Sequence, residues 1–368
     1  MHTSLIPILI FFVFFIGSGF NPNAGLAVYA GTDSFEKTGL TGRLTCINTV
    51  KAAGSGLFMR QNREDEVISI TVSAAGDCTL GTDYAFGYSG SFIEEADKNG
   101  STYFFKNVKH IFSADDLTIV NLETTLTDAD KSADKRFRFK GPPHYTDILK
   151  AGSIEAVNIA NNHIYDYLNK GYEDTMENLK NAEIGFFGFE HKYTVDIKGI
   201  KVGCLGYTGW NDSKSLKECI EKDIEELRKC GAKLVIVSFH WGTEREYFPC
   251  DIQKNLGRHA VDSGADLVIG HHPHVIQGIE SYNGKNIVYS LGNFCFGGNR
   301  NPSDKDTFIY QQTFDFNKGM LTDTQKTKII PCSVSSVKTR NNYQPTPLKG
   351  EEAERVLEKL SRISSGIE

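Results

Sequence analysis

From Val67 onward, short segments rich in β-branched residues alternate with helical patterns, and this alternation constrains the fold more than any other feature. Each apolar segment closes on a polar motif: VISITVSAAGD, DLTIVNLETTL, AVNIANNH, LVIVSFHWG, DLVIGHHPH and NIVYSLGNF. Residues 213–230 and 251–263 place apolar side chains on one face and end before a glycine, which predicts crossover helices. Strands that alternate with crossover helices are typical of an α/β fold.

Two further segments refine this prediction. YTVDIKGIKVGCLGY predicts a hairpin that turns at Lys198 and Gly199, so we expect mixed rather than purely parallel sheets. Residues 350–364 predict a C-terminal helix, with acids at its start, bases toward its end and one apolar face. We interpret this helix as one that packs on the body of the protein.

The N-terminal residues predict export. Leu5 to Ile16 is a continuous apolar run of the length found in signal-peptide cores, and small residues around Ala30 suit cleavage after that position. No charged residue precedes Asp33, whereas signal peptides normally begin with Lys or Arg, so an uncleaved membrane anchor is the competing interpretation. Either interpretation predicts an extracytoplasmic protein, secreted or anchored.

We expect four regions: a signal peptide or anchor over residues 1–30, a linker over 31–65, one domain over 66–345 and a C-terminal helix over 346–368. An α/β fold of roughly 250 to 300 residues can form a single unit. The net charge of −6 argues against a broadly basic surface, so no nucleic-acid partner is expected. Eight cysteines without a C-x-x-C motif indicate neither a disulfide scaffold nor a zinc knuckle.

Side chains with metal-binding groups stand at the ends of five predicted strands: Asp77, Glu123, Asn162, His163, His240, His272 and His274. Loops converge at the carboxyl ends of strands in such folds, so we expect these side chains to meet. Any one of them has an ordinary structural explanation, such as capping a turn or hydrogen bonding in the core. Together they supply the carboxylate, carboxamide and imidazole donors that hold Zn, Mn or Fe. The sequence therefore predicts a site for one or two divalent metal ions.

The segment GHHPH contains three of the ten histidines in the chain. Its H-x-H pair, His272 and His274, flanks a proline that stiffens the loop, and we expect these two to be the metal ligands. His271 is expected to support a ligand or the loop instead.

Four other residues have weaker signals. Asp166 follows His163 by three positions and is expected to orient its imidazole, unless it only favours a helix start. Glu244 after HWGT and Asn293 in SLGNF are expected to support a ligand or contact the substrate, with a surface acid and a turn residue as the alternatives. Lys140, beside Arg138 in FRFKGPP, offers positive charge to an anionic substrate unless it is a solvated loop cation.

The motifs GDCTLG, NLETTLT, ANNHIYDY, FHWGTE, GHHPHVIQG and SLGNFCFG resemble, in the same order, those of the poly-γ-glutamate capsule-synthesis proteins called CapA. That family looks related to the calcineurin-type metallophosphoesterases, and the similarity spans roughly residues 67–316. The resemblance implies an α/β fold in which a mixed β-sheet sandwich is flanked by helices, with the site at the carboxyl ends of strands.

The resemblance also implies roles for individual residues. Asp77 would be the aspartate of the first motif, Glu123 the bridging carboxylate and Asn162 a metal ligand, while His163 would protonate the leaving group. The three remaining ligands would be histidines: His240, His272 and His274. The family pattern Asp-x-His is absent, because Thr79 stands where the histidine belongs. This departure puts the second metal ion, or its affinity, in doubt.

These expectations lead to three functional hypotheses. The first is an exported, metal-dependent hydrolase-like protein of the cell envelope that acts on poly-γ-glutamate. The second is a non-catalytic component that binds this anionic polymer, or partner membrane proteins, during capsule export. The third is an extracytoplasmic phosphoesterase or nucleotidase. The chain lacks a P-loop, so we do not expect it to activate glutamate with ATP by itself.

Overall fold

The computed structural model describes residues 67–367. The predicted export segment, residues 1–30, and the predicted linker, residues 31–65, lie outside the described residues. Within residues 67–367, no helix is both long and apolar enough to cross a lipid bilayer.

The first sheet has eight strands in the order β16-β15-β14-β1-β2-β5-β6, with β13 paired to β1 beside this path. Its strands are β1 (Ile68–Thr79), β2 (Leu117–Leu122), β5 (Ala156–Asn158), β6 (Gly185–Phe187), β13 (Asn293–Phe296), β14 (Asp306–Asn317), β15 (Met320–Ser333) and β16 (Thr346–Pro347). β1, β2, β5 and β6 are parallel, whereas β14 to β16 extend the sheet in antiparallel fashion. The sheet is therefore mixed.

The second sheet has six strands in the order β11-β12-β10-β9-β8-β7 and is also mixed. Its strands are β7 (Tyr193–Ile197), β8 (Ile200–Gly209), β9 (Leu234–Trp241), β10 (Leu267–His271), β11 (Ile279–Tyr282) and β12 (Lys285–Val288). The predicted hairpin is confirmed: β7 and β8 pair antiparallel, and Lys198 and Gly199 turn with φ of 52° and 82°. Positive φ at both central residues is the geometry that a two-residue hairpin favours.

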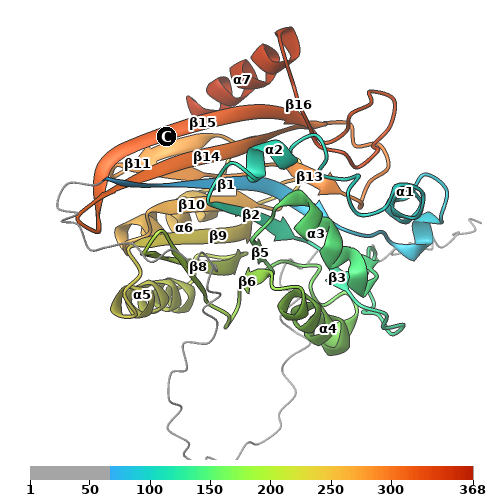
Figure 1. Ribbon diagram of the computed structural model, residues 1–368, viewed down its shortest axis with the longest axis horizontal. Coiled ribbons are helices and arrows are strands. Elements are labelled where there is room, and N and C mark those ends of the chain that lie inside the picture. Colours follow the sequence, from blue (N-terminus) through green and yellow to red (C-terminus); the bar gives the residue numbers. More distant parts are fainter. Residues whose placement is uncertain (1–66, 368) are drawn as a thin grey trace, which may run out of the picture. The chain divides into compact units, whose positions relative to one another are not determined.

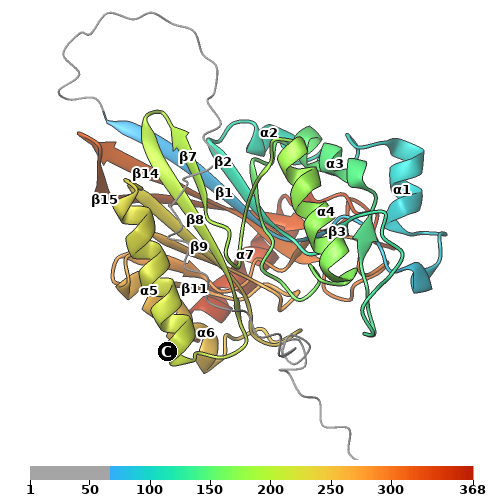
Figure 2. The same ribbon diagram turned by 90° about the horizontal axis from the view of Figure 1, so that it is seen from below.

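The helices and sheets form layers (Figure 1). The helices are α1 (Phe92–Asn99), α2 (Lys109–Phe112), α3 (Thr146–Gly152), α4 (Leu168–Asn181), α5 (Lys214–Lys229), α6 (Asp251–Asp262) and α7 (Glu351–Ser364). The predicted helices in residues 213–230, 251–263 and 350–364 are thereby confirmed within one or two residues. Figure 2, seen from below, shows α5 and α6 on the face of the second sheet that is turned away from the first.

Three apolar cores hold the layers together. The core between the two sheets joins alternate residues of β1 and β2 to residues of β8, β9 and β10, among them Val72, Ile119, Val202, Ile236 and Ile269. A second core lies between the second sheet and helices α5 and α6, and a third packs α1, α3 and α4 against the other face of the first sheet. The central strands are buried on both faces, which explains why they read as continuous apolar runs rather than alternating ones.

The segment NIVYSLGNF departs from the prediction of a single strand. Its first part is β12 of the second sheet, and after a break at residues 289–292 it continues as β13 of the first sheet. The chain turns at Gly292, where φ is 71°. A Cβ at Gly76 would lie 1.9 Å from the Gly292 carbonyl oxygen, so this crossing needs a glycine in β1. The crossing places Asn293 opposite Asp77.

Candidate metal centre

The strand ends bring the predicted site residues together from both sheets. β1, β2 and β5 run parallel in one sheet, and β8, β9 and β10 run parallel in the other. Asp77 lies near the end of β1, Glu123 follows β2, and His240 is the penultimate residue of β9. The two sheets meet here, because Asp77 Oδ2 lies 3.0 Å from His274 Nδ1 in the loop after β10.

Asp77 is fully buried and surrounded by donors. Its Oδ1 accepts a hydrogen bond of 2.9 Å from Asn121 Nδ2 and lies 3.4 Å from His271 Nδ1. Burial alone would raise the pKa of Asp77, but the contacts with His271 and His274 outweigh it and hold the pKa well below its ordinary value. Asp77 is therefore an ionised carboxylate in the interior.

Glu123 is the most unusual group in the cluster. Both of its carboxylate oxygens are buried and have no hydrogen-bond partner among the described residues. Three histidine Nε2 atoms surround its Oε1, at 3.6 Å from His240, 3.8 Å from His274 and 3.9 Å from His163. Burial raises the pKa of Glu123 well above its ordinary value. Because an unpaired buried carboxyl costs free energy, its lone pairs fit a role as ligands to a cation.

His240 and His272 form the opposite side of the cluster. His240 Nε2 lies 2.9 Å from Asn162 Oδ1, and the His240 and His272 ring centroids are 4.7 Å apart. His272 Nδ1 is buried without a partner among the described residues. Burial lowers the pKa of His240 well below its ordinary value and that of His272 to about 3. Both rings are therefore neutral at physiological pH, which is the form that binds metals.

Among residues 67–367, three overlapping groups of side chains have ligand atoms close enough to share one cation. They are Asp77 with Glu123 and His274, Glu123 with His240 and His272, and Glu244 with His272 and His274. Glu123 belongs to two of these groups. The donor set of carboxylates and imidazoles, together with the unpartnered Glu123 oxygens, fits one divalent cation or an adjacent pair.

His163 lies beside the cluster, with its two ring nitrogens in different surroundings. Nδ1 is 2.7 Å from Asp166 Oδ2, and because a carboxylate only accepts, Nδ1 carries the hydrogen. Nε2 faces Glu123. Burial lowers the pKa of His163, and the charge of Asp166 opposes this effect. Asp166 does not start a helix, because α4 begins at Leu168, so orientation of the imidazole is the role that its contacts support.

The loop after β10 holds its histidines in an unusual backbone geometry. His272 and His274 have φ of 96° and 58°, a region that residues other than glycine rarely adopt. Such positions persist where the surrounding structure requires them, and they concentrate at functional sites. His271 ends β10 on the other side of Asp77, and it belongs to none of the three candidate groups. Both of its ring nitrogens are buried without a hydrogen-bond partner among the described residues, so the predicted distinction between His271 and the H-x-H pair stays a prediction.

The other predicted residues differ in how close they lie to the cluster. Asn293 Nδ2 donates to the His274 carbonyl at 3.1 Å, so it supports the histidine loop. Glu244 is exposed at the rim, near His272 and His274. Lys140 lies apart from the cluster: its Nζ donates to Ala129 O at 2.6 Å and sits over the rings of Tyr84 and Tyr167.

Three residues that lie in or beside the candidate centre were not predicted from the sequence. Asn121 donates to Asp77 and lies 3.3 Å from His240 Nδ1. Trp210 packs edge-on against His272, with ring centroids 4.7 Å apart, and against His240 at 5.7 Å. Lys135 donates to Asp166 Oδ1 at 2.6 Å. Trp210 directly follows β8, so the rule that polar and aromatic strand ends converge would have found it; Lys135 has no such signal.

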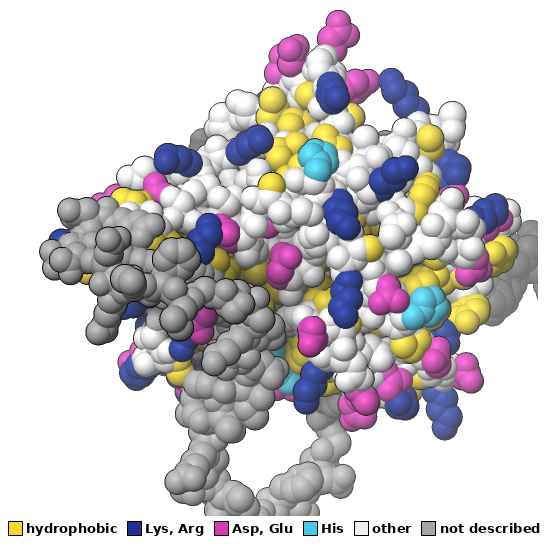
Figure 3. All heavy atoms as spheres, viewed as in Figure 1, with side chains coloured by type: hydrophobic (Ala, Val, Ile, Leu, Met, Phe, Trp, Pro, Cys, Tyr) yellow, Lys and Arg dark blue, Asp and Glu magenta, His cyan; other side chains and the backbone are white. Residues whose placement is uncertain are grey.

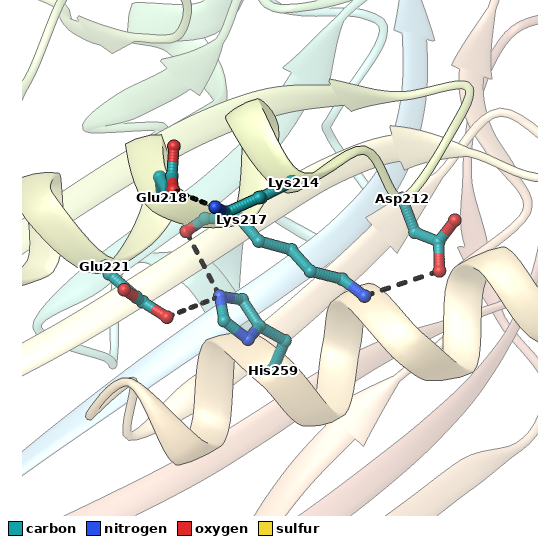
Figure 4. A pocket seen from close by; sticks show the side chains of 6 residues that line it. All are labelled: Asp212, Lys214, Lys217, Glu218, Glu221 and His259. Carbon is teal, nitrogen blue, oxygen red and sulfur yellow. Dashed lines mark hydrogen bonds and ion pairs between the residues drawn. The ribbon is translucent and has the colours of Figure 1, made fainter.

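A surface pocket of about 460 Å³ lies elsewhere, lined by Asp212, Lys214, Lys217, Glu218, Glu221 and His259 (Figure 4). It shares no residue with the cluster. Its charges are already paired, since Lys217 lies 3.4 Å from Asp212 and His259 lies 3.4 Å from Glu221. Among the described residues that line it, no buried unpartnered donor or acceptor points to a ligand.

Comparison with known proteins identifies relatives. Residues 71–298 match the family described as bacterial capsule synthesis protein PGA_cap. The chain is 34% identical over 255 residues to the PGA biosynthesis protein CapA of Bacillus subtilis (strain 168), which covers 63% of this chain and 64% of that protein. It is 29% identical over 264 residues to the capsule biosynthesis protein CapA of Bacillus anthracis, which covers 64% and 61%. These matches therefore span less than two thirds of either relative.

Among solved structures, a hypothetical protein from Thermus thermophilus aligns with a TM-score of 0.43 at 15% identity. That alignment covers 71% of this chain and 99% of the other.

Proposed function

Because the chain belongs to the PGA_cap family of capsule synthesis proteins, which includes CapA, we propose that it is an exported cell-envelope protein of poly-γ-glutamate biosynthesis with a metal-dependent hydrolase site. The observation that carries the hydrolase part is Glu123, whose two buried oxygens have no hydrogen-bond partner among the described residues and whose Oε1 faces three histidines. A structural role alone does not account for such a carboxylate.

The residues that would hold the metal follow from the candidate groups. Asp77, Glu123 and His274 form one set, and Glu123, Asn162, His240 and His272 form the other, with Glu123 shared as in the calcineurin-type metallophosphoesterases. A divalent ion in such a set supplies Lewis acidity and makes hydroxide available near neutral pH. Mn, Zn and Fe all suit these ligands.

His163 would pass a proton to the leaving group from its doubly protonated form, in which Nδ1 keeps its hydrogen on Asp166 and Nε2 carries the proton that is transferred. Its Nδ1 is fixed on Asp166, so its Nε2 is directed at the space beside Glu123 where a substrate would react. Lys135 in turn fixes Asp166 by donating to its Oδ1. This arrangement suits hydrolysis of a phosphoester, or cleavage or transfer of an amide.

One observation favours the second candidate, a non-catalytic polymer-binding or assembly component. Thr79 replaces the histidine of the usual first motif, and its hydroxyl donates to the Glu123 carbonyl oxygen at 3.2 Å, which engages it with the backbone. The set around Asp77 therefore has one ligand fewer than the related enzymes. A reduced metal complement would leave the protein able to bind polymer without cleaving it.

The full chain would be purified, its bound metal counted by elemental analysis, and hydrolysis of poly-γ-glutamate, bis-p-nitrophenyl phosphate and nucleoside monophosphates measured. We expect one or two divalent ions per chain and metal-dependent activity on one substrate class. Absence of metal would refute the hydrolase proposal, and metal without turnover would favour the assembly component. Preference for the nucleotides would support an extracytoplasmic nucleotidase.

Two variants separate the proposed roles. His240→Ala should lose bound metal and activity together, whereas His163→Ala should retain metal and lose mainly the rate. Equal loss of metal in both variants would contradict the role of His163. Membrane fractionation of the producing cell would test the proposed extracytoplasmic location and association with membrane capsule-synthesis proteins.

A further inference from the structure

The loop of residues 127–139 is hydrogen-bonded to Asp166, the residue that contacts the His163 imidazole. Lys135 Nζ donates to Asp166 Oδ1 at 2.6 Å and to the Asn162 carbonyl oxygen at 2.8 Å. The Phe139 backbone N–H donates to Asp166 Oδ2 at 2.6 Å, and the Ala133 N–H donates to the Asp166 carbonyl oxygen at 2.9 Å. These bonds to Asn162 and Asp166 therefore hold the loop at the edge of the candidate metal centre.

An aromatic path leads along this loop from the centre to the surface. The Phe139 ring lies 4.5 Å from the His163 ring, and Phe137 stacks parallel to Phe139 with centroids 6.4 Å apart. Phe86 closes the path from the other side, 6.0 Å from Phe137. Phe137 is an apolar ring, yet it is 39% exposed. Exposed rings next to a site commonly contact ligands.

Two arginines belong to the same segment as Phe137 and Phe139. Arg136 lies over the Phe137 ring, with its Cζ 4.9 Å from the centroid. The Arg138 guanidinium makes one long hydrogen bond, 3.4 Å to Ser132 Oγ. Within residues 67–367 neither has a carboxylate partner, whereas the lysines of the pocket in Figure 4 do. Figure 3 shows one face of the molecule, on which the two signs of charge intermingle.

We propose that residues 136–139, here called the Arg136–Phe139 strip, bind a chain that carries repeated carboxylates and lead it to His163. Guanidinium groups pair with carboxylates through two parallel hydrogen bonds, and aromatic rings pack on methylene groups and amide planes. A γ-linked glutamate chain offers both in every unit. A glycerol phosphate chain offers charge without planar groups, so the rings favour the carboxylate chain. The inference rests on the proposed function, since it names the polymer subsite of the same centre.

The test is fluorescence anisotropy of a dye-labelled, γ-linked glutamate decamer with the full chain. Arg136→Gln/Arg138→Gln should weaken binding about tenfold, and Phe137→Ala several-fold. The matched control is Lys222→Gln/Lys229→Gln, which removes two exposed cations from α5 and should change binding less than twofold. Circular dichroism and melting temperature of each variant would establish that it is folded.

The outcomes separate this inference from the proposed hydrolase. If the double arginine variant hydrolyses bis-p-nitrophenyl phosphate normally and also binds the decamer as tightly as the wild type, polymer binding by the Arg136–Phe139 strip is refuted while the proposed hydrolase activity stands. If the wild type holds no metal yet decamer binding depends on the two arginines, the hydrolase fails and the strip stands. A wild type that does not bind the decamer, or prefers a glycerol phosphate oligomer, also overturns the inference.

Discussion

Asn121 connects the two sheets at the candidate metal centre, because it contacts Asp77 of the first sheet and His240 of the second. Its replacement by leucine is the sharpest test of this arrangement. The side chain is fully buried. Its Nδ2 donates to Asp77 at 2.9 Å and reaches His240 at 3.3 Å, and its Oδ1 accepts from Asn158 at 3.1 Å and from Asn161 at 3.3 Å. Leucine has a similar size and removes all four bonds.

The loss of stability depends on which hydrogen bonds each partner of Asn121 retains in the variant. Asn158, Asn161 and Asp77 keep other hydrogen bonds, so each loses only the net value of one bond, about 0.5–1.5 kcal/mol. His240 Nδ1 has no other partner among the described residues, and a buried orphan costs about 1–3 kcal/mol. We expect a total loss of about 5 kcal/mol, which for about 300 folded residues corresponds to a melting temperature lower by about 8 °C.

The assay is urea unfolding in EDTA, followed by calorimetric titration of the folded variant with Mn²⁺. Asn121→Leu should also weaken metal binding about 10- to 100-fold, because Asp77 and His240 lose their orienting partner. The control is Asn341→Leu, an equally buried asparagine with bonds of 2.8 to 3.0 Å to Phe296, Asn299 and Tyr343. It should lose stability but keep metal affinity. A loss below about 1 kcal/mol for Asn121→Leu, or equal loss of metal affinity in both variants, would refute the reasoning.

Three further predictions concern other parts of the molecule. In Trp241→Phe, Trp210 is the remaining tryptophan, and because its ring lies 4.7 Å from a cluster histidine, added Cu²⁺ should quench its emission, with Trp210→Phe as the control. Burial raises the pKa of Asp115 to about 6, above its unfolded value of about 3.9, so its stabilising effect is complete below about pH 4 and is lost as the pH rises through about 6. Asp115→Asn should therefore stabilise the protein at pH 8 but not at pH 4, as measured by urea unfolding. Burial alone would raise the pKa of Asp306, but the α7 cations outweigh it and hold the pKa below its ordinary value. Arg355→Met should therefore lower the melting temperature at pH 7, and this loss should shrink as the pH falls below the unfolded value of about 3.9.

The elements that the sequence predicted well are those with a local signal. The hairpin at Lys198 and Gly199 follows from a turn that only certain residues favour, and α5 and α6 follow from apolar periodicity and a glycine stop. The prediction failed at residues 286–294, where an apolar run reads the same whether it stays in one sheet or crosses to another. The crossing depends on the fit of Gly76 against Gly292, two residues that are distant in the sequence.

For the candidate site, the strand-end rule located the side chains but not their contacts. Asp77, Glu123, His240 and the H-x-H pair could be named because each closes an apolar run. Lys140 was expected to offer its charge to an anionic substrate; its ammonium contacts Ala129, Tyr84 and Tyr167, and its contact with a substrate stays a prediction. Lys135, five residues earlier, makes the contact with Asp166, and nothing in the local pattern distinguishes the two lysines.

The sequence by itself determined the α/β alternation, the family and the set of candidate metal-binding side chains, because these depend on residue identity and on periods of a few residues. The tertiary structure alone decided that Glu123 has no hydrogen-bond partner among the described residues, that Asn121 connects Asp77 to His240, and that Phe139 lies beside His163 with Phe137 stacked next to it. Those facts depend on how two sheets meet at one edge. Distances between strands that are remote in the chain are set by packing, and no local pattern encodes them.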